Sequence, residues 1–192
     1  MSLDPHSLDE VMIDIQNVGR AAGVDARADL LVDSLRARMA AVEASMSLPS
    51  VGRFGADADP RRMLVLEWVE PPWGGGHWIP DIVKRAGGEP VLGHNGGHEV
   101  TTWDAVREEA PTIVVVAPCG YHLADAAGQA RAVLAELATT PAGRNNEVWA
   151  IDADAYVVRP GPRLVDGLEL LAWIIAGAEG GPPHPDAVTC IT

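Results

Sequence analysis

Residues 64–88, LVLEWVEPPWGGGHWIPDIVKRAGG, contain the pattern that decides the fold. An apolar run that starts at Met63 and leads to Trp68 predicts a β-strand. A turn with Trp73, three glycines and His77 follows it, and Pro80 suits the first turn of a helix. Turns of this kind leave the carboxyl ends of parallel strands, where open α/β sheets bind ligands. We therefore expect the ligand site at this turn.

The elements after this stretch alternate between strands and helices. Apolar periodicity predicts strands at 63–68, 90–92, 112–117 and 147–151, and helices at 78–86, 102–109, 123–138 and 163–177. Alternation of this kind predicts a parallel sheet with helices on both faces. Residues 112–117 are apolar on both sides of the strand, which is typical of a buried central strand. Residues 180–192 hold three prolines and little pattern, so we expect a loose tail.

Two helices are predicted ahead of the sheet. A capping pattern at residues 7–10 begins the first, which ends by Gly23. Residues 25–46 carry apolar positions at helical spacing without an internal glycine or proline, which predicts a rod about 30 Å long. A helix of that length can bridge two lobes. Residues 49–62 have the composition of a linker.

The composition excludes several partners. The chain has 192 residues, 47% of them hydrophobic, and can bury an ordinary core. Its net charge of −13, with scattered basic residues, argues against nucleic acid and against anionic lipid surfaces. Its two cysteines do not form a disulfide framework. Because neither a secretory signal nor a membrane span is visible, the chain as written is expected in the cytoplasm. A missing upstream segment would make it periplasmic or place it at the cell surface.

Three segments together resemble a known family. They are LEWVEPPWGGGHWIPDIVKRAGG at 66–88 with the preceding strand, TTWDAVREEAPTIVVVAPCGY at 101–121, and DADAYVVRPGPRLVDGLELLA at 152–172. They resemble the substrate-binding proteins of ABC importers that carry cobalamin and iron-siderophores, the cobalamin-binding branch in particular. The resemblance implies two α/β lobes joined by one long helix, with the ligand held between the lobes.

The resemblance divides the chain into three parts. Residues 1–23 would be the remnant of an amino-terminal lobe that is otherwise missing, 24–48 the lobe-connecting helix, and 49–192 the carboxyl-terminal ligand-binding lobe. The expected fold is α/β: a three-layer α/β/α lobe with a mainly parallel sheet, preceded by the long helix. Since a missing lobe removes half of the ligand contacts, we expect weakened affinity. We also expect a homodimer through the apolar surface that the missing lobe leaves.

The resemblance places an aromatic ligand contact on the turn after the first strand of the lobe. That position is Trp73, with Trp68 close by, and a flat aromatic ring suits a flat macrocycle. Packing of these tryptophans, or of Trp78, in the core is the alternative. Gly74 and Gly75 are interpreted as letting the backbone pass close to a bulky ligand. A phosphate cradle is less well supported, because no Lys or Ser/Thr follows at the P-loop position.

The family's loop after the strand at 147–151 faces the ligand cleft. Tyr156 and Arg159 are therefore expected to contact the ligand, with the guanidinium offering a rigid fork of donors. Asp152, Asp154 and Arg163 belong to the same candidate cluster. For Arg163, at a helix start, the alternative to ligand contact is a structural role.

Histidines raise the question of a metal site. His77, His94, His98 and His122, with Cys119, lack the spacing of a structural zinc site, so no metal site is expected. His77 is expected to contribute hydrogen bonds at the ligand site. Cys119 is interpreted as a small apolar filler behind a buried strand.

Asp104 is the expected contact with a membrane permease. In the resembling importers a carboxylate at this place docks on arginines of the permease, and an exposed acid steers and orients such an association. The alternative is local: Thr101 or Thr102 caps the helix, and Asp104 interacts with the positive end of its dipole. Both roles are compatible. The family usually has Glu here, so the shorter Asp is a departure.

Nothing in the sequence demands an enzyme. No Ser-His-Asp order, nucleophile elbow or recognisable carboxylate pair is present. The expected function is capture of a corrinoid such as cobalamin, or a related chelate such as an iron-siderophore, and its delivery to an ABC permease, with no cofactor required. One alternative is an enzyme similar to tetrapyrrole metal chelatases, with His77 as the metal-handling base. Another is a cytoplasmic ligand-sensing module.

Overall fold

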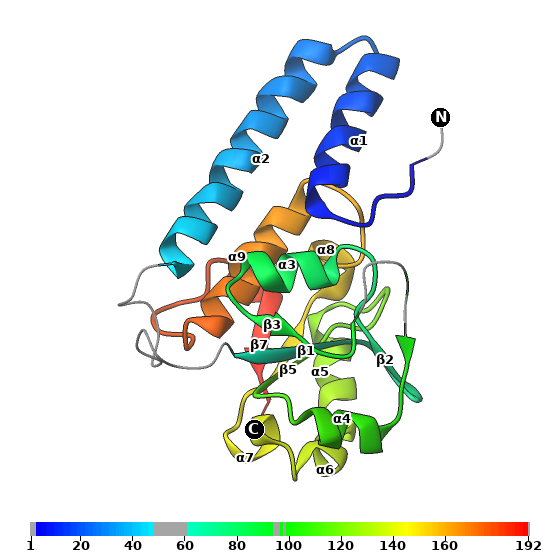
Figure 1. Ribbon diagram of the computed structural model, residues 1–192, viewed down its shortest axis with the longest axis vertical. Helices are drawn as coiled ribbons and strands as arrows, with labels where there is room; N and C mark the ends of the chain where they lie inside the picture. Colours follow the sequence, from blue (N-terminus) through cyan, green and yellow to red (C-terminus); the bar gives the residue numbers. More distant parts are fainter. Residues whose placement is uncertain (1–2, 48–60, 94–96, 98, 192) are drawn as a thin grey trace.

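The computed structural model describes residues 3–47, 61–93, 97 and 99–191 (Figure 1). Its centre is a sheet in the order β4-β2-β1-β5-β6-β7, and β3 also pairs with β1. The strands are β1 (Arg62–Val69), β2 (Pro72–Gly74), β3 (Glu89–Pro90), β4 (Glu99–Val100), β5 (Ile113–Val116), β6 (Val148–Ile151) and β7 (Val188–Cys190). The predicted linker at 49–62 lies outside the described residues up to position 60.

The sheet is parallel at its centre and antiparallel toward its edges. Strands β3, β1, β5 and β6 run parallel, whereas β2, β4 and β7 run antiparallel to their neighbours. The outer edge of β1 is shared, because its start pairs with β3 and its end with β2. The α/β fold with a mainly parallel sheet is confirmed. Strand β2, in contrast, lies in a stretch that was expected to be an irregular turn.

Strand residues alternate between two hydrophobic cores. Met63 and Val65 face one core, and Leu64 and Leu66 face the other. Figure 1 shows helices on both sides of the sheet. The first core contains side chains of α1, α2, α3 and α9, and the second those of α4 to α7. This period of two follows from the pleat of a strand that is covered on both faces.

The helices are close to the predicted ones. They are α1 (Leu8–Ala21), α2 (Asp25–Met46), α3 (Ile79–Arg85), α4 (Trp103–Glu109), α5 (Leu123–Ala132), α6 (Leu134–Leu137), α7 (Pro141–Arg144), α8 (Ala153–Tyr156) and α9 (Arg163–Ile175). The helix predicted at 123–138 is interrupted at Val133, whose backbone leaves the helical region. The hydroxyl of Thr102 accepts the Ala105 N–H at 3.2 Å, so the capping prediction for α4 is confirmed.

Helices α1 and α2 form a hairpin that extends beyond the sheet and its covering helices (Figure 1). Its base contributes Leu8, Met12, Leu35 and Met39 to the first core. The far part of the hairpin exposes large apolar side chains, namely Ile13, Val18, Val24, Leu30 and Leu31. Because apolar surface in water is unfavourable, this end of the hairpin is a candidate contact surface.

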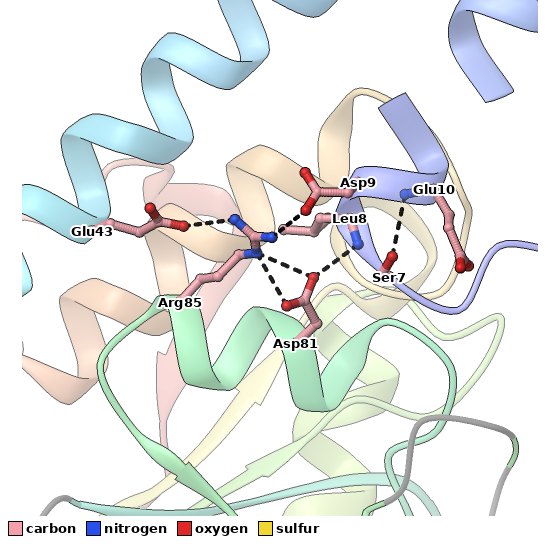
Figure 2. A network of polar contacts seen from close by, with 7 residues as sticks. All are labelled: Ser7, Leu8, Asp9, Glu10, Glu43, Asp81 and Arg85. Atoms are coloured by element: carbon pink, nitrogen blue, oxygen red, sulfur yellow. Dashed lines mark hydrogen bonds and ion pairs between the residues drawn. The ribbon is translucent and has the colours of Figure 1, made fainter. Parts of the chain in front are cut away.

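Charged contacts fasten the hairpin to the rest of the molecule (Figure 2). Arg85 on α3 pairs with Asp81 at 3.1 Å, with Glu43 of α2 at 2.7 Å and with Asp9 of α1 at 2.7 Å. The Asp81 carboxylate also accepts the Leu8 N–H at 2.9 Å, which satisfies a free donor at the start of α1. One guanidinium therefore joins three helices.

The carboxyl-terminal tail is ordered, so the prediction of a loose tail is wrong. Residues 188–190 form β7, which pairs with β6 through the register Ala150 to Thr189. Val188 and Ile191 are buried against the sheet. The last proline is Pro185, so the residues after it all have backbone N–H groups that can form strand hydrogen bonds. The edge of β6 that faces away from β5 provides their partner.

Candidate ligand-binding site

A pocket of about 330 Å³ lies at the carboxyl ends of β1 and β5. Among the described residues, those that line it are Glu67, Trp68, Trp73 and Cys119. Two aromatic side chains thus share it with one carboxylate and one thiol. Carboxyl ends of parallel strands are the common place of ligand sites in open α/β sheets, so this pocket is the candidate site.

The hairpin of β1 and β2 brings the two tryptophans together. Trp68 and Trp73 are direct partners in the antiparallel register. Trp68 is 37% exposed, its ring N–H donates to the Glu70 carbonyl at 3.0 Å, and its ring centroid is 5.8 Å from that of Tyr121. Trp78, in contrast, is buried in the core and donates to the Val157 carbonyl at 2.8 Å. The structure therefore separates two tryptophans at the pocket from one in the core.

Glu67 is a buried carboxylate between the apolar residues Leu66 and Trp68 of β1. It is 6% exposed, and its Oε2 accepts the Gly76 N–H at 2.8 Å. Its backbone carbonyl accepts the Cys119 N–H at 3.2 Å. Buried charges need such partners. Glu67 thereby holds the glycine turn and the loop after β5 against the end of β1.

Gly74 and Gly75 have a packing reason in the structure. A Cβ on Gly74 would lie 2.7 Å from the Leu92 carbonyl carbon, and one on Gly75 would lie 2.5 Å from Cγ2 of Ile79. The close approach is thus between segments of the protein. A ligand contact at these glycines stays a prediction.

Cys119 is exposed, so its interpretation as a buried filler is wrong. The strand ends at Val116, and the following turn carries the thiol out to the pocket. Tyr121 on the same turn packs on Trp68 and was not singled out from the sequence. An aromatic residue shortly after a buried parallel strand is the signal that marks it.

Arg159 is tied to the edge of the pocket through α8. Its Nη2 donates to the Asp154 carboxylate at 2.6 Å, and the Asp154 N–H donates to the Tyr121 carbonyl at 3.2 Å. The hydrogen bond with Asp154 raises the pKa of Arg159, and Cys119 contributes electrostatically to the same shift. The guanidinium is therefore near the pocket and already paired.

Tyr156 and His77 lie elsewhere. The Tyr156 ring packs against the core beside α9, 5.4 Å from the ring of His184 and 5.7 Å from the guanidinium carbon of Arg163. The His77 ring stacks on that of His6 at 5.6 Å, with the planes 12° apart. Neither is among the residues that line the pocket in the described part of the chain. Direct ligand contacts by Tyr156 and His77 stay predictions.

Acidic residues and a histidine meet between α2, α9 and the tail. Among the described residues, Asp166, Glu169 and His184 have ligand atoms close enough to hold a metal ion. Arg38 already donates to Asp166 at 2.5 Å and to Glu169 at 2.7 Å and 2.9 Å. One guanidinium thus pairs with both carboxylates, and the cluster is an ion-pair network that joins α2 to α9. His94 and His98 lie outside the described residues.

Asp104 projects from the first turn of α4. Its side chain is 85% exposed and pairs with Arg107 at 2.6 Å, and Arg107 also pairs with Glu136 at 2.9 Å. The carboxylate is accessible to a partner, although a partner's arginine would compete with Arg107. Docking through Asp104 stays a prediction.

The sequence matches no protein-family model and no curated protein. Solved structures do share its fold. A periplasmic heme-binding protein from Roseiflexus sp. RS-1 matches with TM-score 0.71 and 24% identity, over 91% of this chain and 65% of that one. A periplasmic heme-binding protein from Pseudomonas aeruginosa matches with TM-score 0.73 and 20% identity, over 97% of this chain and 66% of that one. The periplasmic vitamin B12-binding protein of Vibrio cholerae matches with TM-score 0.68 and 20% identity, over 93% of this chain and 65% of that one.

These similarities establish the lobe fold of periplasmic binding proteins, with a central, mostly parallel sheet. This chain spans slightly less than two thirds of each of the three solved chains. None of the helices in the described residues is long and apolar enough to cross a membrane.

Proposed function

We propose that the chain acts as the substrate-binding component of an ABC importer, which captures a metal chelate of the corrinoid or siderophore type and delivers it to a permease. The observation that carries this proposal is the pocket of Trp68 and Trp73 at the carboxyl ends of β1 and β5. The fold similarity to periplasmic heme-binding and vitamin B12-binding proteins supports it. The proposal assigns binding and no catalysis.

The chemistry of the pocket suits a broad, partly apolar ligand. Indole rings offer large contact areas with little loss of side-chain entropy, and Tyr121 extends the aromatic surface beside Trp68. In this proposal the described lobe contacts one face of the ligand. A second surface, either another lobe or a second copy, would exclude water from the other face. In this proposal α2 is the helix that joins the lobes.

The predicted site residues receive different roles. Trp68 and Trp73 contact the ligand, and Arg159 donates to its polar groups from the edge. Gly74 and Gly75 shape the turn, and a ligand contact there needs only backbone atoms. Ligand contacts by Tyr156 and His77 stay predictions: the Tyr156 ring packs against the core beside α9, and the His77 ring stacks on that of His6. The proposed ligand is cobalamin or a ferric chelate, and no resident cofactor is part of the proposal.

We place the working protein outside the cytoplasm. The expectation of a cytoplasmic protein gains no support from the structural neighbours, several of which are named periplasmic. Delivery to a permease from that side also fits the proposed direction of transport. His77, which the chelatase alternative would use as its metal-handling base, is not among the described residues that line the pocket.

Tryptophan fluorescence tests the ligand class. Titration with cyanocobalamin and with ferrichrome, a ferric hydroxamate chelate, should quench emission with at least one of them. Trp73→Ala should weaken that binding by about tenfold or more, as expected for a buried aromatic anchor. Trp173→Phe is the matched control, since Trp173 lies on α9 against Trp149. A failure of both ligands to bind, or equal effects of the two variants, would refute the proposal.

Charge reversal tests permease docking. Asp104→Lys should slow association with the permease in vesicles and leave chelate binding unchanged, because an exposed acid contributes mainly to encounter rate. Glu108→Lys is the control, an equal charge change at another exposed position of α4. If both variants slow association equally, Asp104 has no specific role.

A further inference from the structure

Acidic groups outnumber basic groups around the pocket in the described residues. Glu67 lines the pocket. Asp152 caps α8, and Asp154 on α8 donates its N–H to the carbonyl of Tyr121, whose ring packs on Trp68. Glu70 follows Trp68 by two positions and is exposed. Glu67 and Glu70 lie at the end of β1, and Asp152 and Asp154 follow β6, so all four are at the carboxyl-end edge of the parallel strands.

The basic side chains of this region are already paired with carboxylates. Both Nε and Nη2 of Arg159 donate to one oxygen of Asp154, at 3.1 Å and 2.6 Å. Nδ1 of His122 lies 3.1 Å from Oδ2 of Asp152. The Arg159–Asp154 pair is neutral as a unit, so it attracts an incoming anion only weakly. An anionic group that took over Arg159 would leave Asp154 without its partner.

We infer that this pocket selects chelates that are neutral or cationic over chelates of the same size that carry negative charge. The inference rests on the proposed function, because it concerns the ligand of the same pocket. The net charge of −13 adds a negative field over the whole surface, which slows the approach of anions. The carboxylates at the mouth act at shorter range, within the screening length of about 10 Å at 0.1 M salt.

The inference separates ligand classes that share size and metal. A heme carries propionates that are ionised at neutral pH, and a tricatecholate complex of iron carries several negative charges. Both would bring anionic groups to a pocket that the Glu67 carboxylate lines, next to an Arg159 guanidinium that already pairs with Asp154. A corrinoid with amide side chains and a ferric hydroxamate lack this penalty. The pocket therefore favours the latter two classes.

Matched ligands isolate charge from shape. Ferrioxamine B and its N-acetyl and N-succinyl derivatives are cationic, neutral and anionic versions of one ferric chelate. Cyanocobalamin and its monocarboxylic acid form a neutral and anionic pair of corrinoids. In whichever series binds, the anionic member should bind about tenfold more weakly than the neutral one at low salt. The difference should shrink at high salt because screening removes it.

Two outcomes overturn the inference. Equal or tighter binding of the anionic member within a series that binds would refute charge selection and leave the proposed function standing. Absence of binding in both series would refute the proposed function and this inference together. The two failures are thus distinguishable.

Variants of the ion pair provide an independent readout. Asp154→Asn should release Arg159 and improve the ratio of anionic to neutral binding several-fold, whereas Arg159→Gln should lower it. Asp33→Asn on the exposed face of α2 removes the same charge away from the pocket and should leave the ratio unchanged. An equal effect of Asp33→Asn and Asp154→Asn would show that only net charge matters and would overturn the local assignment. Circular dichroism checks that each variant folds.

Discussion

Replacing Gly74 by alanine tests why the glycine turn has its sequence. The new Cβ would lie 2.7 Å from the Leu92 carbonyl carbon and closer still to the carbonyl oxygen. Both atoms belong to the backbone, so no rotation of a side chain relieves the overlap. Strand β2 would have to move away from residue 92, which disturbs the pairing of Trp73 with Trp68. The structure therefore predicts a loss of stability without any ligand present.

The size of the effect follows from overpacking of a buried site. One extra methyl in a well-packed region costs about 1–3 kcal/mol, and a backbone obstacle places Gly74→Ala near the upper end, at about 3 kcal/mol. For a chain of this length, about 3 kcal/mol lowers the Tm by about 6–12 °C. Gly128→Ala makes the same chemical change in α5, where nothing lies within 4 Å of the new Cβ. It should stabilise the helix by about 0.5–1 kcal/mol.

Thermal melts by circular dichroism measure both variants without ligand. The expected result is a lower Tm for Gly74→Ala and a Tm raised by about 1–4 °C for Gly128→Ala. If Gly74→Ala melts with the parent protein, the close approach to Leu92 is absent in solution. If it melts normally and also loses chelate binding, the glycine serves the ligand, as the sequence interpretation held.

Three further predictions concern the ion pairs, the thiols and the hairpin. Arg85→Met should lower the free energy of unfolding by about 2–4 kcal/mol, because it leaves the largely buried charge of Asp81 without its partner. Asp9→Ala removes only an exposed partner of Arg85 and should cost less than about 1 kcal/mol. Urea midpoints measure both variants, and similar shifts would contradict this. Iodoacetamide should label exposed Cys119 before Cys190, because burial raises the pKa of the Cys190 thiol and so lowers its thiolate fraction at pH values below that pKa. Equal labelling rates of the two thiols near pH 8 would refute this. A chelate that quenches the tryptophans should protect Cys119. The exposed apolar end of the α1–α2 hairpin should drive self-association, and a clean monomer by light scattering at high concentration would contradict it.

Strong periodicity made much of the fold predictable. Strand β5 and helix α2 were predicted within one residue at each end, since a continuous apolar run and a long helical repeat each leave few alternatives. The turn after β1 was expected to hold the ligand site, because such sites are common at strand ends of α/β sheets. A pocket does lie there, and its use as a ligand site stays a prediction. Short elements were missed. Strands β2, β4 and β7 have two or three residues each, and a strand that short is defined by its partner.

Side-chain environment was the least predictable part of the site. Glu67 lies between apolar strand residues yet is buried with the Gly76 N–H as its partner, and Cys119 follows a buried strand yet is exposed. In both cases the three-dimensional path of the turn after the strand decides the environment, and the hydropathy pattern does not contain that path. Tyr156 leaves strand β6 at the same edge of the sheet but packs behind it, beside α9. The position of Tyr156 after β6 determines at which edge of the sheet it lies, and packing against α9 determines on which side of the sheet its ring lies.

The sequence by itself determined the α/β class and the long helix ahead of the sheet, and it predicted the edge of the sheet at which we propose the ligand site. These features depend on local periodicity and on the rule that strand ends carry sites. Only the tertiary structure decided that Trp68 and Trp73 share a pocket, that Arg159 is neutralised by Asp154, and that the tail closes the edge of the sheet. The physical reason is that burial and pairing depend on what approaches from elsewhere in the chain, and a one-dimensional pattern does not contain that neighbour.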